Sequence, residues 1–151
     1  MSTGLNASTI AGIIETLLGR EVTVKNGPAG KGPNALIAVY ASPDKPVAAC
    51  VGCSIQFASY AAAALSLVPR EVAEGDIRAG KLSDVLDENF REVMNVFGGI
   101  LSSPGHRVVL DRITGSGEAP DEISKMLSES SPVSFEVEVE GYGKGLISLA
   151  A

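Results

Sequence analysis

The chain lacks several of the residues on which common kinds of function depend. It has no tryptophan and only three tyrosines and four phenylalanines among 151 residues, so aliphatic side chains must fill its interior. Lysine and arginine number 12 against 18 aspartates and glutamates, and they do not cluster. The net charge of −6 therefore argues against binding to nucleic-acid phosphates.

The sequence also has no long apolar stretch, and we expect no secretory leader. No run of consecutive apolar residues is long enough to span a bilayer. The opening residues "MSTGLNASTIAGIIETLLGR" do not have the basic segment and apolar run of a signal peptide. We therefore expect a cytoplasmic protein without a membrane partner.

The chain has only two cysteines and one histidine, the residues that most often bind transition metals or carry out thiol chemistry. Cys50 and Cys53 have the spacing of a redox dithiol or of half a zinc site, but the chain has no second pair to complete that site. They lie in what looks like a buried strand, where residues three apart point to opposite faces. We interpret them as small, buried, reduced cysteines, with a redox or metal role as the alternative. We expect no metal site and no cofactor of its own.

Two further groups of polar residues have a simple structural interpretation. His106 is the only histidine and lies in an expected turn without the partners of a catalytic triad, so we expect a surface position. Glu136, Glu138 and Glu140 alternate with apolar residues, which is typical of the solvent side of a strand.

The remaining pattern predicts one mixed domain over residues 1–151. Helical spacing is found at 8–18, 54–68 and about 83–101, while strands are expected at 20–27, 35–41, 45–54, 106–113 and, as a hairpin, within 134–150. Ser8 or Thr9 is expected to cap the first helix, and Ser83 or Asp84 the third. Segment 69–81 reads as a loop with a short helical turn, and segment 114–132 as a loop with a short helix. The turn-rich segment 27–34 lacks the residues of a phosphate-binding loop. We expect an α+β fold, a mainly antiparallel sheet with long helices on one face.

The helix expected at 83–101 has two distinct faces. Its apolar residues gather into one stripe at about 100° per residue, formed by Leu82, Leu86, Phe90, Val93, Phe97 and Leu101. Glu88, Glu92, Asn95 and Gly99 stack in a row on nearly the opposite side.

A solvated helix face is one interpretation of that row. Asparagine and glycine are poor helix formers, however, and glycine costs about 1 kcal/mol relative to alanine in a helix interior. A small residue one turn after Asn95 would let a partner approach closely. The alternative is therefore a functional face.

The stretch "DENFREVMNVFGGIL" resembles the signature helix of the chemotaxis phosphatases CheC, CheX and FliY, in which Glu is followed by two residues, Asn and, shortly after, Gly. The order of the surrounding elements is similar over nearly the whole chain. The single copy of the signature makes the chain more similar to CheX than to CheC. It departs from the usual family pattern at Ile100, in place of a small basic run, and at Ile113, in place of a proline.

The resemblance implies a CheC-like fold and hydrolysis of the aspartyl phosphate on a receiver domain like CheY. Asn95 would orient the attacking water, and Glu92 would pair with the receiver's active-site lysine. Glu88, Gly98 and Gly99 would contact the partner, Mg²⁺ would belong to the receiver, and the chain would form a homodimer. Two alternatives remain: a non-catalytic adaptor that binds a receiver or another signalling protein through the same helix, and a small structural or ligand-binding domain in which the Glu and Asn are coincidental.

Overall fold

The computed structural model describes residues 6–27, 35–115, 118, 120–129 and 133–150. The helices are α1 (Ala7–Leu18), α2 (Ile55–Leu65), α3 (Arg70–Ala79), α4 (Asp84–Leu101) and α5 (Asp121–Glu129). The strands are β1 (Val22–Asn26), β2 (Leu36–Ser42), β3 (Lys45–Cys53), β4 (Val109–Gly115), β5 (Val133–Val139) and β6 (Gly143–Ala150). Most of the turn-rich segment 27–34 lies outside the described residues.

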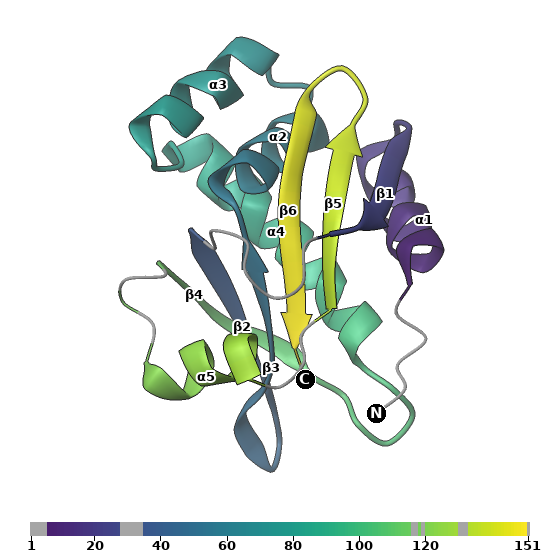
Figure 1. Ribbon diagram of the computed structural model, residues 1–151, viewed down its shortest axis with the longest axis vertical. Coiled ribbons are helices and arrows are strands. Elements are labelled where there is room, and N and C mark those ends of the chain that lie inside the picture. The colour runs from purple at the N-terminus through teal and green to yellow at the C-terminus, as the bar shows by residue number, and fades with distance from the viewer. Residues whose placement is uncertain (1–5, 28–34, 116–117, 119, 130–132, 151) are drawn as a thin grey trace.

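The strands form one sheet in the order β1-β5-β6-β3-β2-β4 (Figure 1). Every pairing among the described strands is antiparallel. The two predicted hairpins, β2 with β3 and β5 with β6, both form, and the β2–β3 hairpin crosses the middle of the sheet. The predicted α+β class with a mainly antiparallel sheet is confirmed.

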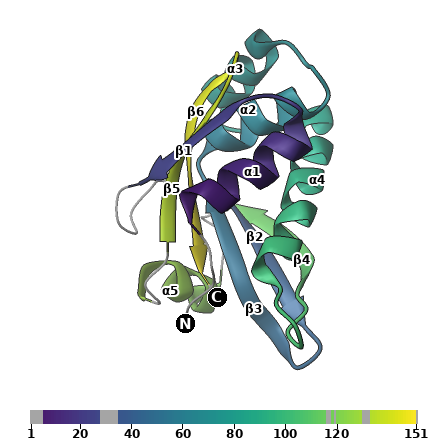
Figure 2. The same ribbon diagram turned by 90° about the vertical axis from the view of Figure 1, so that its right-hand side faces the viewer.

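Helices cover both faces of the sheet, unequally. The longer helices α1, α2 and α4 lie against one face, and the short α5 lies against the other (Figure 2). The main core fills the first interface. A smaller apolar cluster beneath α5 includes Ile37, Val39, Cys50, Ile123 and Leu127. Alternate residues of the central strands therefore serve two separate cores.

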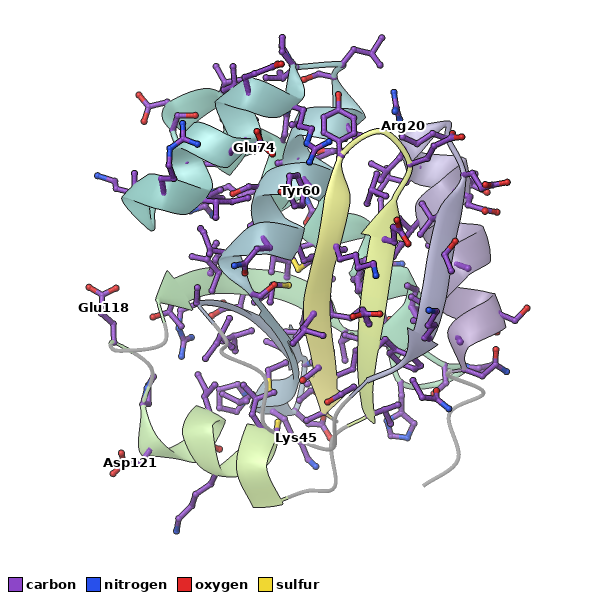
Figure 3. The ribbon with its side chains drawn as sticks, turned by 45° about the horizontal axis from the view of Figure 1, so that its top comes forward. Arg20, Lys45, Tyr60, Glu74, Glu118 and Asp121 are labelled. Atoms are coloured by element: carbon purple, nitrogen blue, oxygen red, sulfur yellow. The ribbon has the colours of Figure 1, made fainter. Side chains whose placement is uncertain are left out.

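Alanine explains how α2 fits between the sheet and α4. Its small side chains are buried around most of the helix, at Ala58, Ala61, Ala62, Ala63 and Ala64. The strand that α2 covers, β6, has glycines at the contact with the helix. A Cβ on Gly143 would lie 2.7 Å from the ring of Tyr60, a residue of α2 (Figure 3). At Gly145 a Cβ would lie 2.3 Å from the backbone nitrogen of Phe57. Both layers lack bulk where they meet, so the helix backbone approaches β6 closely.

Three sequence predictions about local structure were wrong. Segment 69–81, expected to be a loop with a short helical turn, contains the helix α3, which has few apolar residues and buries only Ala73. The strand expected from His106 begins at Val109, because a bridge between Ser103 and His106 closes a turn before it.

The third concerns the cap of α1. Asn6, and not Ser8 or Thr9, caps the helix, with its side chain accepting a hydrogen bond from the Thr9 N–H. The helix therefore begins at Ala7, one residue earlier than expected.

Candidate functional site

The long helix α4 has the two faces that its sequence predicts. Leu82, just before the helix, and Leu86, Phe90, Val93 and Phe97 within it are buried, and Leu101 is half-buried. On the other side Glu88, Glu92, Asn95 and Gly99 are all exposed. The carboxylate of Glu92 and the carboxamide of Asn95 therefore share one outward row, about one helical turn apart.

Neither side chain is committed to holding the fold together. The side chains of Glu92 and Asn95 make no hydrogen bond or ion pair with any residue that the structure describes. Asn89, on the same helix, is different: its Nδ2 donates to the carbonyl of Ala62 at 2.9 Å and to the Ser66 hydroxyl at 2.6 Å. Asn89 thus joins α4 to α2, whereas the hydrogen-bonding groups of Asn95 are available to a partner.

The two glycines that follow Asn95 have different positions. A Cβ on Gly99 would meet nothing within 4 Å, so this residue presents open surface. Gly98 is buried, and a Cβ there would lie 3.5 Å from the carbonyl oxygen of Val108 and 3.6 Å from the Tyr40 ring. Gly98 is buried because it falls on the apolar side of the helix, whereas Gly99 is exposed. The partner contact expected at both glycines stays a prediction.

Tyr40 of β2 anchors the helix directly before Asn95. Its buried hydroxyl donates a hydrogen bond to the carbonyl oxygen of Met94 at 2.6 Å. Burial, followed by the effects of Cys53 and Cys50, raises the pKa of Tyr40 far above its ordinary value. The hydroxyl therefore stays protonated and remains a donor, which holds this turn of α4 against the sheet.

A groove of about 370 Å³ lies beside the outward row. Its lining residues come from α4 and from the chain that leads into β4, and they are Asn95, Gly98, Gly99, Ser102, Arg107, Val108, Val109 and Leu110. The hydroxyl of Ser102 joins the two walls, since it accepts from the Val108 N–H at 3.0 Å and lies 2.8 Å from the Gly98 carbonyl oxygen as a donor.

Sequence reasoning missed the contribution of Arg107 to this groove. The residue follows a turn and precedes a strand, and nothing in that local pattern distinguishes it from an ordinary surface arginine. Its position beside Asn95 depends on how the chain returns along α4, which is a tertiary effect.

The outward face of α4 is acidic toward its beginning. Asp84, Asp87, Glu88 and Glu92 all lie there, and only Asp87 has an ion pair, with Arg91 at 3.5 Å, among the described residues. Acidic side chains in the first turn also suit the positive end of the helix dipole. The charge of the face thus changes along the helix, from carboxylates at the start to the amide of Asn95, the exposed Gly99 and the nearby Arg107 at the end.

The cysteines behave as the sequence predicts. Cys50 belongs to the cluster under α5 and Cys53 to the main core, so they point to opposite faces of the sheet. Burial raises the pKa of Cys50 to about 12 and that of Cys53 further. The described residues contain no group of histidines, cysteines and carboxylates able to hold a metal ion.

The other polar residues also lie where they were expected. His106 is exposed. Glu138 and Glu140 are exposed and Glu136 is half-buried, on the side of β5 away from the main core. Ile100 and Ile113, the two departures from the family pattern, are half-buried and pack against the main core.

No family model matches this chain, and no curated protein matches it either. Solved structures do. A chain of the FliM–SpeE complex from H. pylori superposes with a TM-score of 0.65 at 10% identity, over 95% of this chain and 80% of that chain. The FliM middle domain from Vibrio alginolyticus gives 0.63 at 10%, over 96% and 87%. FliY from Thermotoga maritima gives 0.56 at 13%, over 93% and 81%.

The chain has the fold of the FliM middle domain and of FliY. FliY is one of the proteins whose signature helix α4 resembles, so the expected CheC-like architecture is confirmed at the level of the fold. No helix in the described part of the chain is long and apolar enough to cross a membrane.

Proposed function

We propose that this chain hydrolyses the aspartyl phosphate of a response-regulator receiver domain. The observation that carries the proposal is the outward pair on α4. Glu92 and Asn95 are exposed and share one row, and their side chains make no hydrogen bond or ion pair with a described residue. The similarity in fold to FliY supports it.

The chemistry needs little from the protein beyond placement. A water molecule attacks phosphorus, the bond from phosphorus to the aspartyl carboxylate oxygen breaks, and the products are the free carboxylate and inorganic phosphate. Asn95 both accepts from and donates to that water, which holds it in line with the breaking bond. Glu92, one turn away, pairs with the receiver's lysine and fixes the docked orientation. The divalent ion in this reaction is supplied by the receiver.

The test measures phosphate release from receiver domains of the same organism, charged with acetyl phosphate. The wild-type chain should accelerate release from one of them, and Asn95→Ala should lose most of that acceleration, by about a hundredfold if water positioning is its role. Glu138→Gln, which alters an exposed carboxylate on β5, is the matched control and should keep wild-type activity.

A second function is favoured by a specific observation. One of the similar solved structures is FliM in complex with another protein, SpeE, so a domain of this fold is found with a protein partner. In this alternative α4 binds a receiver or another signalling protein without hydrolysis. Unchanged phosphate release together with intact binding would leave this adaptor role, and the absence of both would leave a structural domain.

A further inference from the structure

Arg107 and Asn95 line the same groove. The two side chains come from different walls, Asn95 from α4 and Arg107 from the segment that leads into β4. Arg107 is exposed and makes no hydrogen bond or ion pair with any described residue. By contrast Arg112, further along the same segment, is paired with Asp111 at 2.7 Å.

The lining of the groove carries a positive charge, although the protein as a whole is acidic. Arg107 is the one charged residue in its lining, although the chain as a whole carries a net charge of −6. An uncommitted guanidinium has five N–H donors in a planar fork, which suits the oxygens of a carboxylate or a phosphoryl group. The carboxylates of the outward face lie further toward the beginning of α4, so the groove end is the part that complements an anion.

The positions of both walls are fixed by contacts already described. Ser102 links the end of α4 to Val108, the residue after Arg107, and Tyr40 holds the turn before Asn95. Val109 adds an apolar surface at the groove, since the residue is 51% exposed. An anion brought by a partner protein would therefore meet a charge, an amide and an apolar contact together.

We propose that Arg107 binds the phosphoryl oxygens of the partner's aspartyl phosphate while Asn95 orients the attacking water. The inference rests on the proposed function. Arg107 exchanges no proton and forms no covalent bond; it stabilises the negative charge on the phosphoryl oxygens as the bond to the carboxylate breaks. The groove thereby distinguishes a phosphorylated partner from an unphosphorylated one.

The first test compares Arg107→Ala, Arg107→Lys and the control Arg112→Ala in phosphate release from the charged receiver. Arg107→Ala should lower kcat/KM at least about tenfold, and Arg107→Lys should recover part of the loss because a point charge remains. Arg112→Ala should match the wild type. A wild-type chain that accelerates release beside an equally active Arg107→Ala would overturn the role of Arg107 and leave the proposed function standing.

The second test needs no receiver. Inorganic phosphate is titrated into the labelled chain while the backbone amide signals of Gly98 and Gly99 are followed by NMR. Saturable shifts in the wild type that disappear in Arg107→Ala support an anion site, and identical titrations of the two proteins overturn it. If the wild type accelerates no receiver, the proposed function fails, and this titration alone decides whether Arg107 binds phosphoryl oxygens.

Discussion

At the scale of single residues, what a side chain contacts separates a structural residue from a functional candidate. Asn89 and Asn95 lie on the same helix and are the same amino acid, yet one joins two helices and the other faces solvent with no partner among the described residues. The hydrogen bonds of Asn89 to Ala62 and Ser66 explain why an asparagine, a poor helix former, occurs at that position of α4. That explanation does not extend to Asn95.

A glycine pair tests whether open surface beside Asn95 matters. Gly12 in α1 and Gly99 in α4 are both exposed, and a Cβ on either would meet nothing within 4 Å. Alanine should therefore raise the free energy of unfolding at both positions, by up to about 1 kcal/mol, as measured by urea denaturation. Only Gly99→Ala should also weaken partner binding, because its methyl group lies where the partner approaches. Equal binding by both variants would contradict this use of Gly99.

The sequence predicts the outward row of the site but not the groove beside it. Helical periodicity places Glu92 and Asn95 opposite the apolar stripe, and both are exposed. The same periodicity separates Gly98 from Gly99, although the resemblance alone groups them together. Neither the periodicity nor the resemblance predicts that Arg107 lines the groove. That position depends on how the chain folds back along α4 toward β4, and the separation of Arg107 and Asn95 in the sequence does not determine it.

At the scale of elements, α2 and β6 approach each other closely at Gly145. The Cβ that an alanine would add at Gly145 lies 2.3 Å from the nitrogen and 2.5 Å from the Cα of Phe57, both backbone atoms. A backbone inside a packed helix cannot move aside as the end of a side chain can. The absence of a side chain at Gly145 is thus a requirement of the layer spacing.

Gly145→Ala should therefore be among the most destabilising single changes in this chain. We expect the free energy of unfolding to fall by about 3 kcal/mol or more, measured by urea denaturation, because helix and strand must separate to admit the methyl group. Gly12→Ala serves as the control for the substitution itself. A Gly145→Ala variant as stable as the wild type would show that the two layers are less tightly packed than the structure indicates.

The helix that the sequence did not predict, α3, has few apolar residues. It buries a single residue, Ala73, and its sequence is dominated by charged side chains, which made the segment resemble a polar loop. Its ion pair between Arg70 and Glu74 and its end at Gly80 stabilise a helix that packs mainly against α2. The central hairpin and α4 were predictable because their apolar patterns are dictated by burial.

At the scale of the whole molecule, buried acidic protons make the fold sensitive to alkaline pH. The pKa of Cys50 is raised from 9.0 to about 12 in the folded chain, and burial raises the pKa of Cys53 and Tyr40 as well. Between these limits the unfolded chain releases a proton that the folded chain keeps. The contribution of the protonated Cys50 thiol to the free energy of unfolding is therefore fully present below about pH 9. It is lost as the pH rises toward about 12, the pKa of Cys50 in the folded chain.

Urea denaturation at a series of pH values above about pH 8 checks this expectation. The free energy of unfolding should fall with rising pH, each buried thiol contributing up to about 1.4 kcal/mol per pH unit. Cys50→Ala should show a shallower decline than the wild type, because one of the titrating groups is gone. Parallel pH profiles for the two proteins would show that Cys50 is not the source.

The two thiols lie on opposite faces of the sheet, so their reactivity reports on the opening of each face separately. Cys50 is covered by α5, and Cys53 is covered by the layer that contains α2 and α4, so an added alkylating reagent reaches each sulfur only after a different part of the fold opens. Labelling rates of the two sites, measured separately by mass spectrometry, would then time the detachment of one side of the sheet independently of the other.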